Sequence, residues 1–510
     1  MAKNIFNSIQ LKKPKKNFFD LTHDVKMSAN MGELTPVLTL EVVPGDEIDI
    51  SCESIIRFAP MVAPVMHRMD VSIHYFFVPN RILWDNWEPF ITNNGPNGTG
   101  PDIVAPYLRP GESWVNFSGN VLAFLDYLGV PPIPVGGTTT KISALPMAAY
   151  QCIYNEYYRD QNLVPPVNYK LTDGDNVNTQ ADAERLCSLR VRAWEHDYFT
   201  SSLPFAQKGA AVDIPLGAVN GDANIYSNVG DTTLNGSGGD PYMLGDSNPG
   251  LTDLWAQTDG LTVEPTTIND LRRAFRLQEW LEKNARGGTR YVESILSHFG
   301  VKSSDARLQR PEYITGIKTP VVISEVLNTS GTENQLPQGN MAGHGIAVTS
   351  GNAGKYYAEE HGYIIGIMSV MPKTAYQQGI PRTFLKHDPL DYFWPSFANI
   401  GEQEVQNQEL FAWTSGNTPT NTFGYVPRYA EYKYMPSRVA GDFRTSLDYW
   451  HLGRIFTSTP SLSQGFIECT PGETQRIFAV TDPDTQRLYC HVLNKIKAVR
   501  PMPKYGTPTI

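Results

Sequence analysis

The sequence predicts a large, mainly β protein: a single β-sandwich or barrel with long insertions and a few helices. Only 18% of its 510 residues are charged, where a typical globular chain carries about 25%. Turn formers are abundant, with 42 glycines and 38 prolines. Short apolar or alternating runs are separated by long Gly-, Asn- and Pro-rich segments, a pattern that favours antiparallel strands over βαβ units. The 41% hydrophobic fraction excludes a disordered chain.

Three runs predict strands in the N-terminal part. Residues 36–44 form an apolar run between two prolines, and residues 48–52 alternate between apolar and polar side chains. The strongest candidate covers residues 69–78. Its apolar residues at every second position share one face of an extended chain: Met69, Val71, Ile73 and Tyr75.

Three segments predict helices. Residues 144–160 carry apolar side chains at helical spacing. A second helix is expected to begin after Thr267, which can cap it with Asp270 three residues on, and to stop at the glycines 287–288. Helical spacing relates five positions of this helix: Ile268, Leu271, Phe275, Gln278 and Leu281. A third, short helix is expected over residues 291–299, where a glycine follows.

The C-terminal part predicts further strands and one long loop. Residues 321–327 and 362–371 are apolar runs typical of strands, the second of a buried strand. Alternation returns at residues 475–481 and 488–499 and predicts two more strands. Residues 328–354 are rich in Gly, Asn and Ser, and are predicted to form a loop.

Charge is sorted along the chain. The first 19 residues carry five lysines and no acid, and residues 491–510 carry four basic residues and no acid. Since the whole chain has a net charge of −10, the other 471 residues carry −19. Lysines neutralise phosphates and release counterions, so two basic ends on an acidic body indicate nucleic-acid contact. The alternative, solvated tails that only aid solubility, stays open.

The longest stretch without a base lies in the middle of the chain. Between Lys208 and Arg272 there are nine acids and no lysine or arginine. An acidic, Gly-rich stretch of this length is not expected to form a central strand or a core helix. We expect a surface protrusion over residues 209–265, marked by four acids: Asp222, Asp231, Asp240 and Asp246. The residue spacing of an EF-hand calcium loop is absent.

These features divide the chain into three parts. The predicted organisation is a basic N-terminal arm, a β domain that contains the acidic insertion, and a basic C-terminal tail, over residues 1–19, 20–490 and 491–510. The sequence has neither a run of about 20 apolar residues nor a signal-peptide pattern. We therefore expect no membrane insertion and a chain that is made and kept in a cytoplasm.

No constellation of catalytic or metal-binding residues stands out. Residues 349–355 imitate a phosphate-binding loop, but Thr349 and Tyr356 stand where a glycine and a hydroxyl residue are needed. Five widely spaced cysteines predict buried free thiols rather than disulfides or a zinc site. We expect no enzymatic activity, no metal and no cofactor. A carbohydrate-binding or carbohydrate-active β-sandwich stays open as the alternative, because the chain has nine tryptophans.

One long block resembles a known protein family. It covers residues 284–313 and includes NARGGTRYVESILSHFGV and SDARLQRPEY. Shorter blocks accompany it: FFDLTHD at 18–24, GELTP at 32–36, VPGD at 43–46, PMVAPVMHR at 60–68, YFFVPNR at 75–81 and RVAGDF at 438–443. In these blocks the chain is similar to the major capsid proteins of the Microviridae, small single-stranded DNA phages, and more closely to their gokushovirus-like branch. It departs from the family pattern chiefly in residues 209–265.

The resemblance implies a fold, an assembly and partners. The fold would be an eight-stranded antiparallel jelly roll with long insertions. Copies of the chain would form a T=1 icosahedral shell around a circular single-stranded DNA genome. Further implied partners are an internal scaffolding protein, a DNA pilot protein and a host surface receptor. In gokushovirus-like relatives a long insertion protrudes at the threefold axis, and we assign this role, with host attachment, to residues 209–265. The implied location is the virion, assembled in the host bacterial cytoplasm.

The two basic ends then receive a specific role. We expect them to face the shell interior and to bind DNA through seven residues: Lys12, Lys13, Lys15, Lys16, Lys497, Arg500 and Lys504. Phe18, Phe19 and Tyr505 lie close to them in sequence, and either stack on unpaired bases or pack against the protein. The low charge of the remaining chain is expected for subunit contacts, because interface cores are depleted in Lys, Glu and Asp.

Overall fold

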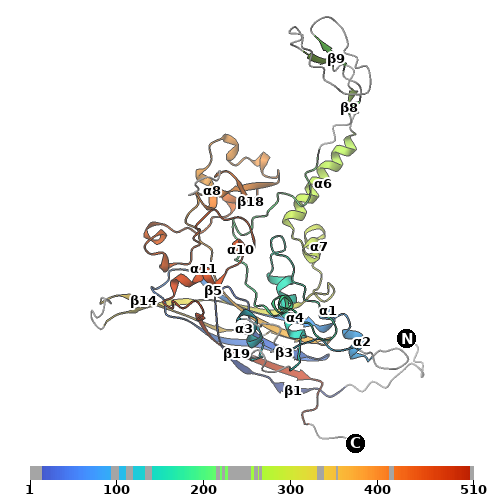
Figure 1. Ribbon diagram of the computed structural model, residues 1–510, viewed down its shortest axis with the longest axis vertical. Helices are drawn as coiled ribbons and strands as arrows, with labels where there is room; N and C mark the ends of the chain where they lie inside the picture. The colour runs from blue at the N-terminus through green and yellow to red at the C-terminus, as the bar shows by residue number, and fades with distance from the viewer. Residues whose placement is uncertain are drawn as a thin grey trace, which may run out of the picture. The chain divides into compact units, whose positions relative to one another are not determined.

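The chain forms two compact units. The larger unit comprises Met1–Ala206 and Thr289–Ile510, and the smaller unit comprises Gln207–Gly288. The computed structural model describes the following residues: 14–93, 103–110, 119–131, 140–213, 219–220, 224–227, 254–257, 262–263, 267–329, 338–351, 354–412 and 419–505. Figure 1 shows the long strands of the larger unit lying together, with the helices α1, α3 and α4 beside them.

The larger sheet has seven strands, and the order of its main path is β1-β19-β4-β14-β13, with β2 on β19 and β15 on β4. All its pairs are antiparallel. The strands are β1 (Asn17–Asp20), β2 (His23–Ala29), β4 (Glu47–Phe58), β13 (Val322–Leu327), β14 (Met341–Ser350), β15 (Gly354–Tyr357) and β19 (Leu488–Arg500). Along β4 and β19 every second side chain is buried, as expected for a sheet with one face in a core and the other open.

The smaller sheet has four strands in the order β12-β5-β16-β3, again all antiparallel. They are β3 (Thr35–Val42), β5 (Met69–Pro79), β12 (Glu312–Pro320) and β16 (Gly362–Pro372). The central strands β5 and β16 are buried on both faces apart from partly exposed His74, because a second layer covers each face of this sheet. The strands predicted at 36–44, 69–78 and 362–371 are confirmed.

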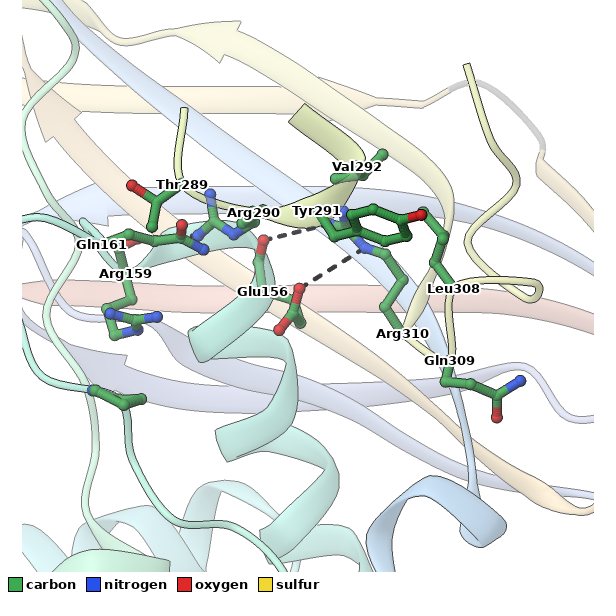
Figure 2. Close-up of a pocket in the computed structure, with 11 residues that line it drawn as sticks. Glu156, Arg159, Gln161, Thr289, Arg290, Tyr291, Val292, Leu308, Gln309 and Arg310 are labelled. Carbon is green, nitrogen blue, oxygen red and sulfur yellow. Dashed lines mark hydrogen bonds and ion pairs between the residues drawn. The ribbon is translucent and has the colours of Figure 1, made fainter. Parts of the chain in front are cut away.

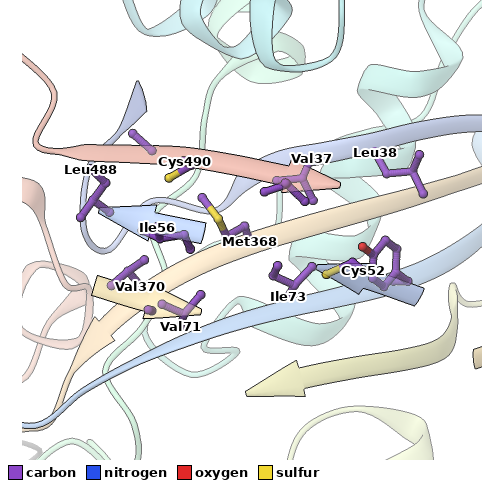
Figure 3. Packing of buried hydrophobic residues seen from close by; sticks show 14 of the residues in the cluster. Val37, Leu38, Cys52, Ile56, Val71, Ile73, Met368, Val370, Leu488 and Cys490 are labelled. Atoms are coloured by element: carbon purple, nitrogen blue, oxygen red, sulfur yellow. The ribbon is translucent and has the colours of Figure 1, made fainter. Parts of the chain in front are cut away.

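The two sheets pack face to face around one hydrophobic core (Figure 3). Val37, Val71 and Val370 come from the smaller sheet, and Ile56 and Leu488 come from the larger one. All five side chains are at most 1% exposed. Full burial of such a side chain contributes about 1.5–3 kcal/mol, so the alternation seen in the sequence of β4 and β19 directly stabilises the sandwich.

A layer of short helices covers the other face of the smaller sheet and encloses a second core. Its helices are α1 (Asn80–Leu83), α2 (Trp87–Ile91), α3 (Gly119–Tyr127), α4 (Leu145–Ile153) and α5 (Gln180–Cys187). The helix predicted over residues 144–160 is α4, continued by the π-helical turn η2 (Tyr154–Tyr158). A two-stranded ribbon, β6 (Tyr107–Leu108) with β7 (Ile142–Ser143), adjoins this layer.

A third core gathers the loop-rich part between β16 and β19. The strands β17 (Glu402–Gln406) and β18 (Thr422–Pro427) pair antiparallel within it. The remaining elements are single turns of helix: η3 (Arg382–Phe384), η4 (Pro389–Asp391), η5 (Pro395–Phe397), α8 (Asn407–Leu410), α9 (Ala430–Lys433), η6 (Gly441–Arg444), η7 (Asp448–Trp450), α10 (Gln464–Ile467), α11 (Pro471–Thr474) and η8 (Gln475–Ile477). The described part of the protein is therefore mainly β with few long helices.

Two predicted helices are confirmed at their caps. In the smaller unit, α6 (Ile268–Arg286) begins where the Thr267 side chain accepts a hydrogen bond from the Asp270 amide at 3.2 Å. In the larger unit, α7 (Tyr291–Phe299) ends at Gly300, which has the left-handed conformation that favours glycine. The smaller unit also contains two short ladders: β8 (Val219–Asn220) with β11 (Thr262–Val263), and β9 (Asn224–Ser227) with β10 (Leu254–Gln257).

The prediction of a loop over residues 328–354 is wrong for residues 341–350. Residues 341–350 form β14, which lies between β4 and β13 in the larger sheet. The glycines that suggested a loop are required by packing. A Cβ atom on Gly343 would lie 2.4 Å from the carbonyl oxygen of Ala63, and one on Gly345 would lie 3.0 Å from the ring of Phe58. The same finding argues against a phosphate-binding loop at residues 349–355, because Thr349 belongs to the strand.

The strand predicted over residues 475–481 is also wrong. Pro471 begins the helical turn α11, and η8 follows directly. Ile477 and Phe478 are consecutive and both buried. A strand with one open face would expose one of such a pair, so the helical turn is the conformation that buries both.

Candidate functional site

The two basic ends of the sequence meet at one edge of the larger sheet. Strand β1 pairs with the end of β19 so that Asn17 lies opposite Arg500, and Asp20 lies opposite Lys497. Residues 491–500, assigned to a basic tail from sequence, thus belong to a sheet strand. We call this region, residues 15–20 with 495–505, the basic edge.

Two predicted DNA-binding residues of the basic edge are held by acids of the same subunit. Lys16 Nζ donates a hydrogen bond to Glu47 Oε1 at 2.7 Å, which raises the Lys16 pKa. Arg500 Nε lies 3.3 Å from Oδ2 of buried Asp46, and its Nη2 donates to the carbonyl oxygen of Glu41 at 2.8 Å. Burial raises the pKa of Asp46, and Arg500 opposes that change by stabilising the carboxylate. Lys16 and Arg500 therefore fasten the edge to the sheet.

The other predicted DNA-binding residues that the structure describes are exposed to solvent. Lys15, Lys497 and Lys504 are exposed, and the aromatic side chains of Phe18 and Tyr505 are 54% and 75% exposed. Lys12 and Lys13 lie outside the described residues, and so do the four acids predicted to mark the protrusion: Asp222, Asp231, Asp240 and Asp246.

The open face of the larger sheet carries charges of both signs. Glu47, Asp49 and Glu53 of β4 alternate with buried residues, and β19 places Lys497 beside Asp49. Lys495 forms an ion pair with Glu53. Sequence reasoning missed these acids because β4 lies more than 400 residues from the C-terminal bases. Only the strand register reveals that the basic edge is neutralised in part within the subunit.

A shallow hollow of about 400 Å³ lies further along this open face. Lys26, Arg57 and His491 contribute basic groups, and the exposed ring of Tyr489 lies among them. Asp24 lies 3.3 Å from both Lys26 Nζ and His491 Nε2. The nearby His491 and then Lys26 lower the pKa of the Asp24 carboxyl. The hollow was not predicted from the sequence, although the alternation in β19 could have indicated that Tyr489 faces outward.

A second feature is a dense group of exposed apolar side chains on the turns around η3, η4, η5 and α9. We call it the aromatic surface: Phe384, Leu390, Tyr392, Phe393, Trp394, Phe397, Ile400, Tyr432, Tyr434 and Met435. The centre of the Phe393 ring lies 5.0 Å from the centre of the Tyr429 ring. Lys386 Nζ lies 3.9 Å from the centre of the Tyr432 ring and 3.2 Å from Glu431 Oε1. These contacts make the surface an ordered one.

Helix α6 of the smaller unit also exposes apolar side chains. Five large hydrophobic side chains on it are exposed: Ile268, Leu271, Phe275, Leu277 and Trp280. Within the described part of this helix only Ala285 is buried. Large exposed apolar patches on soluble proteins mark interaction surfaces. The sequence predicted this helix from the spacing of such residues, but the spacing alone did not show that they are exposed.

The described residues offer little that is typical of a catalytic or metal centre. They contain no group of three or more His, Cys, Asp and Glu side chains placed to hold a metal ion. The five cysteines are all buried and unpaired, as predicted. Burial raises the pKa of Cys152, Cys187 and Cys490 to about 12, so these thiols are poor nucleophiles. Among the described helices, none is long and apolar enough to cross a membrane.

Comparisons with known proteins identify the family of the chain. The chain matches the family model described as "Capsid protein (F protein)" over residues 7–510. Capsid protein VP1 of Bdellovibrio phage phiMH2K is 36% identical over 527 aligned residues, which cover 96% of this chain and 94% of that protein. Capsid protein VP1 of Chlamydia phage 1 is 32% identical, with 100% and 98% covered.

Capsid protein VP1 of Spiroplasma virus 4 is likewise 32% identical, over 96% of this chain and 94% of that protein. The resemblance noted in the sequence blocks is therefore confirmed over nearly the full length. The mainly β, antiparallel architecture agrees with it. The chain belongs to the capsid protein (F protein) family and is a major capsid protein of Microviridae phages.

Proposed function

We propose that copies of this chain self-assemble into a T=1 icosahedral shell around a circular single-stranded DNA genome, and that the role is structural rather than catalytic. The observation that carries the proposal is the amount of ordered apolar side chain left exposed on the aromatic surface and on α6. Stable interfaces bury more than about 1,000 Å² in total. Burying the exposed half of one aromatic side chain removes on the order of 100 Å² from water, about 2.5 kcal/mol.

The sheet topology supports assignment to an eight-stranded jelly roll. β1 and β2 lie end to end along β19, and β14 and β15 lie end to end along β4. If β1 and β2 are counted as one strand, and β14 and β15 as another, these two strands with β19 and β4 make four principal strands. Strand β13 is added at the edge of the sheet. Four strands also make up the facing sheet. The sandwich then consists of two facing sets of four, the arrangement of a jelly roll.

Size distinguishes the shell from its alternative, a carbohydrate-binding or carbohydrate-active β-sandwich protein. We expect the purified chain, supplied with its assembly factors, to elute in the void volume of a sizing column and to form uniform particles in electron micrographs. A chain that remains monomeric and folded at high concentration would contradict self-assembly. Virion location and assembly in the host cytoplasm, with an internal scaffolding protein and a DNA pilot protein, belong to the same proposal.

DNA binding at the basic edge is supported by the meeting of both chain ends on one strand pair. The exposed Lys15, Lys497 and Lys504 are available to phosphates, and exposed Phe18 and Tyr505 are available to stack on bases. The seven nominated residues remain the proposal: Lys12, Lys13, Lys15, Lys16, Lys497, Arg500 and Lys504. Within it, the ion pairs assign Lys16 and Arg500 mainly to fastening the edge.

The test neutralises the arm. Lysines 12, 13, 15 and 16 are replaced by glutamine, and the matched control replaces four exposed lysines elsewhere: Lys141, Lys170, Lys302 and Lys433. We expect the arm variant to package less DNA and to lose about 2 from the slope of log affinity against log salt, at about 0.7 per phosphate contact for the three lysines that the proposal assigns to phosphates. Normal packaging with an unchanged salt slope would contradict the proposal.

Host attachment is proposed for the acidic insertion, residues 209–265. The paired ladders β8–β11 and β9–β10 bring its two limbs together at residues 219–227 and 254–263. Residues 228–253 can therefore be replaced by a short turn that keeps both ladders. We expect this deletion to leave particle yield unchanged and to reduce adsorption to host cells. Loss of particles would instead favour a role in shell stability at the threefold axis.

A further inference from the structure

A pocket of about 440 Å³ in the larger unit is lined by three arginines (Figure 2). They are Arg159, Arg290 and Arg310, and Glu156 contributes the one carboxylate among the lining residues. We call this site the arginine pocket. It is built where the π-helical turn η2 ends, where α7 begins and where the chain approaches β12. Two of its arginines belong to the block at 284–313 that carries the family resemblance, and nothing in the proposed function uses them.

Each guanidinium is held firmly by part of its donors. Arg159 Nη1 donates to the carbonyl oxygen of Val164 at 2.6 Å. Arg290 Nη2 donates to the carbonyl oxygen of Asn155 at 3.1 Å. Arg310 Nη2 donates to the carbonyl oxygen of Glu156 at 3.3 Å, and the Arg310 Cζ lies 4.6 Å from the ring centre of Tyr157. These contacts position the three side chains without using all their donors.

The unused donors are the Nε groups. Those of Arg159, Arg290 and Arg310 are buried, and none has a hydrogen-bond partner within the part of the chain that the structure describes. For Arg310 the nearest acids are Asp305 Oδ1 at 3.3 Å and Glu156 Oε2 at 3.9 Å, and the Arg310 side chain is 10% exposed. Buried donors without partners are costly. Arg159 and Arg290 therefore keep Nε donors for which the described part of a single subunit supplies no acceptor.

Arg159 is the guanidinium that remains available to an anion. Arg290 pairs with Glu293 at 3.0 Å and Arg310 lies 3.3 Å from Asp305, whereas Arg159 forms no ion pair among the described residues. Burial, and then repulsion from Arg290, lower the pKa of Arg159. The pocket also contains the first residues of α7, Tyr291 and Val292, and the amides of a first helical turn have no acceptor within the helix. A carboxylate satisfies guanidinium donors in bidentate geometry and relieves the repulsion.

The exposed side chains of α7, the helix that begins at the pocket, indicate that the anion comes from a protein. Tyr291 is 72% exposed, and Leu296, Phe299 and Val301 of the same helix and its end are exposed as well. Such apolar side chains are covered by protein rather than by phosphates. In a shell the neighbouring protein is another copy of the chain, and each copy carries more acids than bases, 52 against 42.

We propose that the arginine pocket receives an aspartate or glutamate carboxylate from a second copy of this chain. The site would make one subunit contact dependent on charge, in addition to the apolar contacts described above. This inference rests on the proposed self-assembly.

Two measurements test it together. The first is an electron cryomicroscopy structure of wild-type particles. We expect a carboxylate oxygen of a second copy at hydrogen-bond distance from Arg159 or Arg310. The second compares the subunit concentration that gives half-maximal assembly for wild type, Arg159→Gln and the control Arg185→Gln. The control breaks an ion pair with Asp182 outside the pocket. We expect Arg159→Gln to raise that concentration at least about tenfold, since an interfacial charge loses its partner, and Arg185→Gln to change it less than about twofold.

The outcomes separate the inference from the proposed function. Wild-type particles whose arginine pocket is empty, or holds a side chain of the same subunit, overturn the inference and leave self-assembly standing. A phosphate of packaged DNA in the pocket overturns it as well. Wild-type protein that forms no particles overturns both. If Arg159→Gln proves unstable in solution, the wild-type particle structure alone decides.

Discussion

Buried Asn494 ties the two sheets of the sandwich together, and its replacement by alanine provides a quantitative test. The residue lies in the middle of β19 and is fully buried. Its Oδ1 accepts a hydrogen bond from the Tyr75 hydroxyl of β5 at 2.9 Å, and its Nδ2 donates to the carbonyl oxygen of Val37 in β3 at 2.8 Å. One side chain of the larger sheet is thus bonded to two strands of the smaller one.

The magnitude follows from the partners that the change leaves behind. In Asn494→Ala, the Tyr75 hydroxyl loses its acceptor and the Val37 carbonyl loses a donor. Each unsatisfied buried group costs about 1–3 kcal/mol. We therefore expect the free energy of unfolding to fall by about 3–5 kcal/mol. Burial raises the pKa of Tyr75 far above its usual value, so the hydroxyl stays a donor at any working pH.

The assay is urea unfolding of the unassembled subunit, followed by intrinsic fluorescence. Lys495→Ala is the matched control, because it changes the next residue of the strand but removes only an exposed ion pair, and should cost less than about 1 kcal/mol. Tyr75→Phe should cost about 1–2 kcal/mol. The double variant should lose less than both single changes together, since the two side chains share one hydrogen bond. A loss below about 1 kcal/mol for Asn494→Ala, or strict additivity, would refute this reasoning.

Three further predictions concern acid stability, a close approach and the aromatic surface. Burial lowers the pKa of His67 and His74 to about 4, whereas the same side chains in the unfolded chain are protonated below about pH 6.5. The contribution of the two neutral histidines to the free energy of unfolding is therefore complete above about pH 6.5. It falls by up to about 3 kcal/mol per histidine as the pH drops toward 4. Urea midpoints at pH 7.5 and 5.0 measure this, and His74→Gln should reduce the difference. Gly32→Ala should destabilise by more than about 2 kcal/mol in the same assay, because Gly32 has a φ of 84° and its Cβ would lie 1.8 Å from a carbonyl oxygen. Phe384→Ser with Met435→Ser should reduce particle yield and leave subunit stability within about 0.5 kcal/mol, because these side chains are 72% and 89% exposed.

For each of these three predictions, one outcome would contradict the reasoning. An unchanged urea midpoint between pH 7.5 and 5.0 would show that the two histidines titrate normally. Gly119→Ala, at a position where a Cβ meets nothing within 4 Å, should be neutral or stabilising, and an equal loss at both glycines would contradict the close-approach argument. Full particle yield from the double serine variant would remove the aromatic surface from the assembly interface.

Local structure was predictable wherever a periodic signal was strong. The alternation in β4 and β19 follows from the need to bury one face of a sheet, and it is visible in the sequence of those strands alone. Thr267 and Asp270 mark the start of α6 because an orphan amide needs an acceptor. The blocks at 18–24 and 284–313 carried the family resemblance, which the full-length relatives confirm.

Prediction failed where the reason for a residue lay in a distant part of the chain. Gly343 and Gly345 look like loop residues until Phe58 and Ala63 are placed against them. Consecutive Ile477 and Phe478 look like part of an alternating strand until both are found in the core. A side chain that packs across a sheet has no local signature, because the space that it must fill or avoid is defined by residues far away in sequence.

For the interaction surfaces too, the sequence determined some features and the tertiary structure decided the others. The sequence by itself determined that both chain ends are basic, that residues 209–271 are acidic and that few charges cover the remainder, because charge is a property of composition. Only the tertiary structure decided that the basic ends share the β1–β19 strand pair and are partly neutralised by Asp46, Glu47 and Glu53. It also decided that three arginines from separate segments converge on one pocket. Electrostatic interactions act over a few ångströms through space, and folding sets those distances.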